Sequence, residues 1–406
     1  MGIFDRFKPE KRQTVKISDR DGMVQFFGMD AISTSGATIT VETALGVPAY
    51  SGAVNFLAGT LAGLPCHVYK RTGNGRDKIA GGLATILHDA VNDETSSFEW
   101  RKHLFEQVFT GGRAFTFIER SAVGRVMNLW PLDPAGMIVK RENGRKIYTY
   151  TERSQTFRYT ADEIIDIPFM LKADGLAHRG PLSMGKDAIG LAISATAFGS
   201  KFFQNGGVPP FAVTGNFQSG ASMKRASEDL VDATRKAAKD QRMALVLPSG
   251  LEIKPLGSDA EKSQLVELQR FCIEEIARIF SIPPTFLQDL THGTFSNTEQ
   301  QDLHFVKHTI KRWVEQFEQE INLKLFGRQS NKTFVELNMD GLLRGDFKAR
   351  MEGYAQGVQN GILKPNEARR KENMPDDPEG DKLMIQGATV PLGSQPINQG
   401  TDNDAA

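Results

Sequence analysis

The sequence has little cysteine, and this scarcity excludes two classes of protein. Only two cysteines occur in 406 residues, Cys66 and Cys272, and both have apolar neighbours in the sequence. A disulfide framework is excluded by this count, and a cysteine-based metal site lacks a partner histidine at useful spacing. We expect both cysteines to be small buried apolar side chains.

The sequence also lacks a long apolar run. A transmembrane helix needs roughly 18 consecutive apolar residues, and the best candidate, Ala49 to Leu64, is interrupted by glycine, asparagine and threonine. The N-terminus has no apolar core of signal-peptide length, and Arg6 stands where a myristoylation signal has Ser or Thr. We therefore expect a cytosolic chain with no membrane partner.

Net charge is absent as well, because 49 basic residues balance 49 acidic ones. Tight binding to nucleic acid normally requires many uncompensated Lys and Arg residues, which displace counterions from the phosphates. The neutral balance argues against a conventional DNA-binding protein. It does not argue against a surface past which DNA slides.

The sequence up to residue 185 predicts a flexible arm followed by an α+β module. Residues 1–40 are polar and become rich in Gly, Ser and Thr, which favours an arm that is flexible or only lightly docked. In residues 41–185, a helix over Ser97–Phe109 ends at Gly111-Gly112, and short β-branched and aromatic runs follow, separated by Gly- and Asn-bearing turns. These runs, the predicted strands, are Ala114–Glu119, Val126–Pro131, Met137–Arg141, Lys146–Thr151 and Thr156–Tyr159. This pattern indicates a β-meander packed on helices.

Two long helices with a small insertion between them are predicted next. The first, Lys186 to Gln204, is rich in Ala and Gly, which permits close approach of a neighbouring backbone. The second begins at a capping box, Ser258 to Glu261, and ends at Pro283-Pro284. Its expected buried face comprises Leu265, Leu268, Cys272, Ile276 and Ile279.

The insertion, residues 208–257, predicts a small α/β unit. Its expected elements are a strand over Phe211–Asn216, a charged helix over Ser222–Lys239, and a hairpin that joins Met243–Leu247 to Leu251–Lys254.

A second capping box, Ser296 to Glu299, predicts another helix that runs to about Phe326. At 1.5 Å per residue this helix would be roughly 43 Å long. Its expected apolar stripe comprises Leu303, Val306, Ile310, Trp313, Phe317 and Ile321. A further helix is expected over Phe347–Asn360 and a short one after the turn that begins at Gly361. The polar residues from Gln386 onward predict a disordered tail.

Signatures of catalysis are scarce. His304 and His308 lie one helical turn apart but lack the glutamate of the zinc-protease pattern and a third ligand. No Gly-x-Ser-x-Gly elbow occurs. The acidic pairs Glu274-Glu275 and Asp376-Asp377 have no supporting pattern, although a metal-dependent nuclease could use such residues. We therefore expect no catalytic residue, no metal and no cofactor.

Five segments, in order, resemble the signature of tailed-phage portal proteins, in the branch typical of long-tailed phages. They are Leu129–Pro134, Phe202–Pro209, Glu274–Pro284, Thr294–Gln301 and Gly361–Arg369. The resemblance covers roughly residues 45–375. The chain departs from the family pattern at Gly111–Phe115, at Arg179–Leu182 and at Lys364.

The resemblance implies a portal-like α+β fold with named parts. Residues 41–185 would form the wing, residues 186–207 and 258–281 the stem helices, and residues 208–257 the clip. Residues 282–296 would be the tunnel loop and residues 297–346 a long helix with a return strand. Residues 347–385 would be the crown, and residues 386–406 would be the disordered tail.

The resemblance also implies site residues. The DNA-facing residues of the tunnel loop would be Thr285, Gln288, Thr291, His292, Thr294, Phe295 and Ser296. The channel stem would present Lys201, Lys262, Glu267 and Arg270. The docking surface of the clip would comprise Lys224, Arg225, Arg235, Lys236 and Lys239.

The function implied is a channel at one capsid vertex, through which double-stranded DNA is packaged and ejected. The implied partners are other copies of the chain in a ring, normally of twelve, the major capsid protein, the large terminase, head–tail adaptors and DNA bound without sequence preference. The implied location is the virion, with the host cytoplasm during assembly. The alternatives are a metal-dependent nuclease of the packaging machinery and a helical scaffold that forms no ring.

Overall fold

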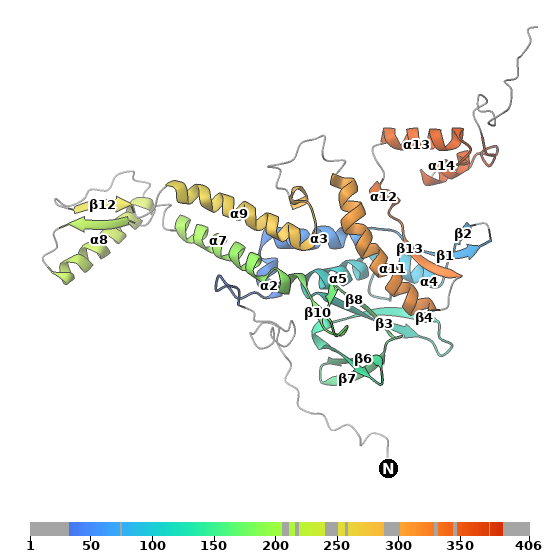
Figure 1. Cartoon of the computed structure of the whole chain (residues 1–406), viewed down its shortest axis with the longest axis horizontal. Helices are drawn as coiled ribbons and strands as arrows, with labels where there is room; N and C mark the ends of the chain where they lie inside the picture. Colours follow the sequence, from blue (N-terminus) through green and yellow to red (C-terminus); the bar gives the residue numbers. More distant parts are fainter. Residues whose placement is uncertain are drawn as a thin grey trace, which may run out of the picture. The chain divides into compact units, whose positions relative to one another are not determined.

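The computed structural model describes residues 32–73, 75–204, 211–215, 219–239, 251–255, 259–287, 301–328, 332–343, 347–372 and 374–384. The chain divides into two units, residues 1–338 and residues 339–406. We describe each unit by itself, with the element labels of Figure 1.

The first unit begins with helices and a hairpin. Its elements to residue 132 are α2 (Val41–Leu45), α3 (Pro48–Ala62), β1 (Cys66–Thr72), β2 (Gly75–Lys78), α4 (Leu83–His88), α5 (Ser97–Thr110), β3 (Arg113–Arg120) and β4 (Val126–Leu132). The elements that follow, to residue 184, are η2 (Pro134–Gly136), β5 (Met137–Glu142), β6 (Arg145–Glu152), β7 (Gln155–Thr160), β8 (Ile164–Pro168), β9 (Met170–Leu171), β10 (His178–Arg179) and α6 (Pro181–Met184).

The rest of the first unit contains the long helices. These elements are α7 (Lys186–Gln204), β11 (Phe211–Gly215), α8 (Gly220–Lys239), β12 (Leu251–Pro255), α9 (Asp259–Phe280), η3 (Pro284–Leu287), the π-helical turn η4 (Val306–Ile310), α11 (Lys311–Phe326) and β13 (Thr333–Leu337). Residues 301–305 are helical and lead into η4.

The end of the predicted flexible arm is docked. Ile39 is fully buried, Ile32 bridges Thr38, and the Asp187 carboxylate of α7 accepts a hydrogen bond from the Thr34 N–H at 2.9 Å. A side chain at Gly190 would collide with Ser33, so this glycine lets residues 33–35 lie against α7. The sequence predicted an arm that is flexible or only lightly docked, and a buried isoleucine and the α7 contacts dock residues 32–40. Residues 1–31 lie outside the described ranges.

The strands form separate sheets, and the predicted single meander is correct only for β5-β6-β7. A second sheet has the order β4-β3-β8, and a third has the order β13-β1-β2. The prediction contained no strand at Ile164–Pro168. That strand is necessary because β3 is buried along most of its length, so both of its edges need hydrogen-bond partners.

An aromatic core joins four helices. The Phe109 ring of α5 lies 5.0 Å from the Trp313 ring of α11 and 6.1 Å from the Phe280 ring of α9. Tyr50 of α3 lies 5.4 Å from Phe280, and its hydroxyl donates a hydrogen bond to the Phe109 carbonyl at 3.0 Å. Aromatic pairs of this geometry add about 0.5–1.5 kcal/mol each beyond the area that they bury. The core therefore fixes α3, α5, α9 and α11 relative to one another.

The predicted apolar stripe of the long helix is buried from Val306 to Ile321, but Leu303 is 58% exposed. The difference has a structural reason. The π-helical turn η4 inserts an extra residue into the helix, so residues before it are rotated relative to a regular 3.6-residue pattern. A prediction based on that regular period therefore places Leu303 on the wrong face.

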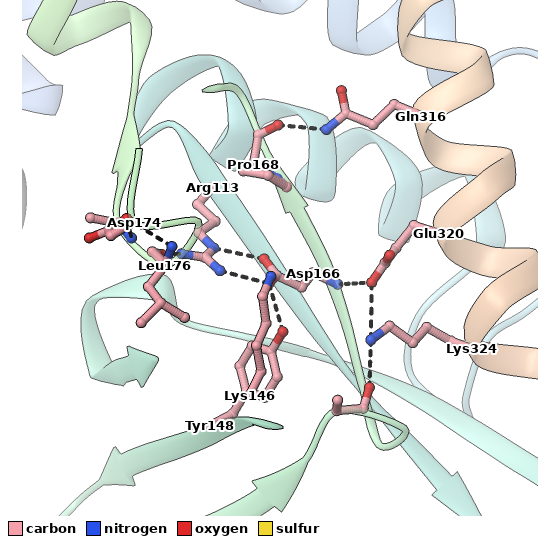
Figure 2. Close-up of polar contacts among 12 residues, drawn as sticks. Arg113, Lys146, Tyr148, Asp166, Pro168, Asp174, Leu176, Gln316, Glu320 and Lys324 are labelled. Carbon is pink, nitrogen blue, oxygen red and sulfur yellow. Dashed lines mark hydrogen bonds and ion pairs between the residues drawn. The ribbon is translucent and has the colours of Figure 1, made fainter. Parts of the chain in front are cut away.

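One flank of α11 covers the open edge of β8 (Figure 2). The Arg312 and Gln316 side chains donate to the carbonyls of Phe169 and Pro168, and the Glu320 carboxylate accepts from the Asp166 N–H at 3.0 Å. One turn further, the Lys324 ammonium donates to the Ala161 carbonyl and lies 3.4 Å from Glu320. Residues spaced four apart lie on one helix face, so this stripe supplies the hydrogen bonds that a missing neighbouring strand would otherwise make.

Another flank of α11 covers the open edge of β13. The Asn322 amide donates to the Val335 carbonyl at 3.0 Å and accepts from the Val335 N–H at 2.7 Å. One turn earlier, the Glu318 carboxylate accepts from the Leu337 N–H at 2.7 Å. Since β13 pairs with β1, helix α11 links the β4-β3-β8 sheet to the β13-β1-β2 sheet.

A buried ion pair lies beneath the contact between α11 and β8 (Figure 2). The Arg113 guanidinium donates to both oxygens of Asp166, at 2.7 and 2.6 Å, and the Tyr148 hydroxyl donates to Asp166 at 2.7 Å. Burial raises the pKa of the Asp166 carboxyl, but these donors outweigh burial and hold the pKa below its ordinary value. Because Tyr148 lies on β6, this cluster also connects the β5-β6-β7 sheet to β3 and β8.

The second unit comprises α12 (Asp340–Leu343), α13 (Phe347–Gln359) and α14 (Pro365–Lys371). Asn366 is almost fully buried, and its side chain exchanges hydrogen bonds with the backbone of Asp377 at 2.9 and 2.8 Å. The segment after α14 is therefore folded back onto that helix. The helices predicted around residues 347–360 and after Gly361 are both present.

We predict that Glu318 gives stability a pH dependence. Burial raises the pKa of this carboxyl from its ordinary 4.5 to about 7, so the folded chain binds an extra proton between these pH values and loses stability as pH rises through them. Glu318→Gln stays neutral and keeps the acceptor for Leu337. Between pH 4.5 and pH 7, the free energy of unfolding of the Gln variant should rise by about 1–2 kcal/mol relative to that of the parent, after allowance for solvent screening. Chemical unfolding at each pH measures this difference.

The matched control is Glu94→Gln, at an exposed position whose charge does not contribute to the pKa shift of Glu318. Its stability difference from the parent should show no such trend. A constant difference for Glu318→Gln across this pH range would contradict the assignment.

Candidate functional site

The two predicted stem helices lie side by side in the first unit (Figure 1). Their observed bounds, Lys186–Gln204 for α7 and Asp259–Phe280 for α9, match the predicted helices closely. A stripe of small residues on α7, Ala192, Ala195 and Gly199, is buried. A Cβ atom at Gly199 would lie 3.7 Å from the side chain of Leu265 on α9. The small residues therefore permit the close helix contact that the sequence predicted.

The remaining surfaces of this helix pair carry exposed large apolar side chains. Phe198 and Phe203 of α7 are 57% and 75% exposed, and Val266 and Phe271 of α9 are 49% and 48% exposed. Five residues separate the members of each pair, so they point roughly 140° apart around their helix. Two different sides of each helix are thus apolar and uncovered within one chain. Clustered exposure of this kind is typical of protein contact surfaces.

Charged residues predicted for the channel stem share these surfaces. Lys201, Glu267 and Arg270 are all exposed. Lys262 lies in α9, but its side chain is outside the description. The structure therefore brings three of the four residues to the surface of the helix pair, and their contact with DNA stays a prediction.

The predicted clip contains α8 and the two-stranded sheet of β11 and β12, in which Phe211 pairs with Pro255 and Gly215 with Leu251. Lys224, Arg225 and Lys236 are exposed on α8. The side chains of Arg235 and Lys239 lie outside the description, as do residues 243–247 of the predicted hairpin. The described partner of Leu251–Pro255 is thus β11.

Both ends of the predicted tunnel loop are fixed at one aromatic cluster, which consists of Phe56 of α3, Phe286 of η3 and Phe305. The Phe286 ring lies 5.3 Å from Phe56 and 4.7 Å from Phe305, and Phe56 lies 5.4 Å from Phe305. The sequence prediction missed this cluster. Its signal was an aromatic residue near the start of the predicted loop, Phe286, and another nine residues beyond its end, Phe305.

Hydrogen bonds strengthen the same base. The Thr285 hydroxyl bonds to the Gln301 side-chain oxygen at 2.9 Å, and the Thr309 hydroxyl donates to the Ser281 carbonyl. Ser281 has a φ of 56°, a left-handed conformation that ends α9. Thr285, predicted to face DNA, is thus half-buried at the base of the loop. The other predicted loop residues lie outside the described ranges: Gln288, Thr291, His292, Thr294, Phe295 and Ser296.

The candidate acidic pairs have structural partners. Arg278 forms ion pairs with Glu274, at 3.0 Å, and with Glu275, and Arg370 forms one with Asp376 at 2.6 Å. Within the described ranges, no group of three or more His, Cys, Asp and Glu side chains could hold a metal ion. Nor does any described helix have the length and apolar character needed to cross a bilayer.

Comparison with known proteins identifies the family. The model of the phage portal protein family matches residues 48–373. The chain belongs to the phage portal protein family. It is 28% identical to a probable portal protein of Streptomyces phage phiC31 over 386 residues, which cover 91% of this chain and 84% of the relative. It is 26% identical to the portal protein of Enterobacteria phage HK97 over 379 residues, covering 91% and 88%.

A solved structure shows the same fold. A chain from the neck of a native gene transfer agent particle, computed with C12 symmetry, superposes with a TM-score of 0.55 at 17% identity and covers 89% of this chain and 100% of that chain. The predicted α+β, portal-like fold class is therefore confirmed.

We predict that Phe286 holds the base of the tunnel loop. Phe286→Ala removes two of the three ring contacts in the cluster, which should cost about 1–2 kcal/mol at a half-buried site. Hydrogen–deuterium exchange in residues 282–287 and 301–310 should then accelerate about 5- to 30-fold.

Phe98→Ala, which removes an exposed ring at the start of α5, should leave exchange in these two segments unchanged. Unchanged exchange in the Phe286 variant, or an equal acceleration in every segment of the chain, would contradict a local role for Phe286.

Proposed function

We propose that this chain is a portal subunit, copies of which form a ring-shaped channel at one capsid vertex for the packaging and ejection of double-stranded DNA. Family membership across residues 48–373 is the observation that carries the proposal. The helix pair α7–α9 and the fixed base of the loop supply physical support, since they provide a rigid frame with surfaces left uncovered.

The apolar side chains of the helix pair favour assembly into a ring. In a cyclic assembly each subunit uses one surface against one neighbour and a different surface against the other. Exposed apolar residues on two sides of both α7 and α9 suit such a head-to-tail contact. The C12 symmetry of the neck particle is a property of that relative, and we propose a ring of twelve copies for this chain by analogy.

The remaining partners follow the same proposal. The exposed basic residues of α8 would dock the large terminase and later the head–tail adaptors, and the wing would contact the major capsid protein. The subunit would act in the virion after assembly in the host cytoplasm. The tunnel loop and the charged stem residues would face DNA, which a chain of zero net charge would hold only weakly.

We further propose that the chain has no catalytic activity. No described cluster of ligands favours the nuclease alternative, and arginines form ion pairs with Glu274, Glu275 and Asp376. DNA cleavage by the purified chain that disappears on chelation of divalent metal would contradict this proposal.

We predict that the exposed rings of the helix pair drive assembly. The double variant Phe203→Ser/Phe271→Ser removes a large apolar side chain from each helix, and it should abolish rings at micromolar concentration because the interface loses two buried aromatic groups. Negative-stain microscopy and light scattering measure ring formation and mass.

The matched control is Phe98→Ser, which alters a phenylalanine that is 46% exposed at the start of α5 and belongs to neither helix of the pair. This variant should form rings as the parent does. Rings that persist in the double variant, or rings lost equally in the control, would contradict the proposed interface.

A further inference from the structure

The β5-β6-β7 sheet concentrates positive charge in a chain that is neutral overall. Residues 137–160 contain six Lys or Arg residues and two Glu residues, which gives a net charge of +4. Four of the basic residues are exposed and form no ion pair with any residue in the described ranges: Lys140, Arg141, Arg145 and Arg153. The neutrality of the whole chain therefore hides a strongly basic module.

The pairing register assigns these side chains to faces. Tyr148 lies opposite Val139 and Tyr159, and all three pack into a core cluster with Phe115. Side chains alternate between the faces of a strand, so the neighbouring rows face outward. In one of these rows, Thr149 of β6 lies between Ile138 of β5 and Arg158 of β7. In the next row, Ile147 of β6 lies between Lys140 of β5 and Thr160 of β7.

The outer face combines cations with hydroxyl groups. Its basic residues are Lys140, Arg145 and Arg158, and its only acidic residue is Glu142, which forms an ion pair with Arg158. The remaining polar residues of this face are Thr149, Thr151, Thr156 and Thr160; the Thr160 hydroxyl donates to the Glu163 carboxylate just beyond β7, and the Thr151 and Thr156 hydroxyls bond to each other. Lys, Arg and Thr side chains are typical ligands of nucleic-acid phosphates.

The turn that joins β6 to β7 adds a second observation. Its two residues, Arg153 and Ser154, have φ values of 44° and 73°, where Asn-Gly is strongly preferred. The other turn of the same sheet has the preferred pair, Asn143 and Gly144, at φ values of 49° and 78°. An arginine in the left-handed region is strained, and strain of this kind is concentrated at functional positions. Arg153 is exposed and adds a further cation at the end of the sheet.

From the face and the turn together, we infer that the outer face of the β5-β6-β7 sheet binds the phosphate backbone of double-stranded DNA without sequence preference. This surface is distinct from the proposed channel elements, which lie on α7, α9 and the tunnel loop. The inference rests on the proposed function in one respect, because a portal subunit comes into contact with DNA during packaging. The complementary charge favours a polyanion over an apolar partner.

The test measures binding of the purified full-length chain to a fluorescent DNA duplex of about 30 base pairs, by anisotropy, from about 50 to about 200 mM KCl. The triple variant Lys140→Gln/Arg145→Gln/Arg153→Gln should bind about 10-fold or more weakly at the lower salt concentration. The slope of log affinity against log salt should fall by about 2–3, because each lost phosphate contact contributes about 0.9.

The matched control removes the same number of exposed charges from β1 and the turn between β3 and β4, with Lys70→Gln/Arg71→Gln/Arg125→Gln. It should keep the parent's affinity and slope. Equal weakening in both triple variants would show a net-charge effect and would overturn the inference, as would unchanged affinity in the sheet variant. Unchanged DNA binding with failed incorporation into capsids would assign the face to a protein partner instead.

A single variant separates a binding role from a structural one. Arg153→Gly relieves the left-handed backbone, so its melting temperature should be equal to the parent's or higher, while its DNA affinity should fall. A purely structural Arg153 would leave affinity unchanged. Light scattering on the parent reports ring formation, so a parent that forms no rings would count against the proposed function, and unchanged DNA binding by the variants would count against this inference alone.

Discussion

Helix α11 satisfies the open edges of two sheets at once, and most of the first unit depends on this arrangement. A strand at the edge of a sheet exposes unpaired N–H and C=O groups, which are costly when buried and prone to pairing with other chains when exposed. Arg312, Gln316, Glu320 and Lys324 supply side-chain partners for the β8 segment, and Glu318 and Asn322 do so for β13. The apolar stripe between these flanks packs against α5, so one helix links both sheets to the aromatic core.

This link also places the elements proposed to act on DNA. Immediately before α11, the π-helical turn carries Thr309, whose hydroxyl bonds to the end of α9 at Ser281. The described segments that flank the predicted tunnel loop meet at the cluster of Phe56, Phe286 and Phe305. The same frame leaves apolar surfaces of α7 and α9 uncovered, as a ring would require.

The sequence predicted helices better than it predicted what their polar faces do. The bounds of α7 and α9 and the stripe from Val306 to Ile321 followed from spacing, because burial of apolar residues leaves a clear period. The polar flanks of α11 carry no such signal. Polar residues spaced four apart give the same sequence pattern whether they bond to water or to the edge of a strand. Leu303 was placed wrongly because a π turn changes the period without a recognisable residue. The pairing of β1 with β13, more than 250 residues apart, depends on tertiary packing and has no local signature.

Charge gives a similar lesson for function. Zero net charge correctly describes the chain but averages over a basic sheet and acidic segments elsewhere. The separation becomes visible only when strand register assigns Lys140 and Arg145 to one outward face. Of the site residues implied by the family resemblance, the structure describes the stem and clip positions in part and the tunnel loop only at Thr285. The roles of these residues follow from the family and stay proposals.

We propose that a frame held together by α11 presents the α7–α9 pair for ring assembly. Electron cryomicroscopy of the assembled chain would show whether it does. We expect Phe203 and Phe271 to be buried against neighbouring copies, while Asn322 remains bonded to Val335 and Glu320 to the Asp166 N–H. Rings in which both phenylalanines still face solvent, or in which α11 has left either strand edge, would contradict this proposal.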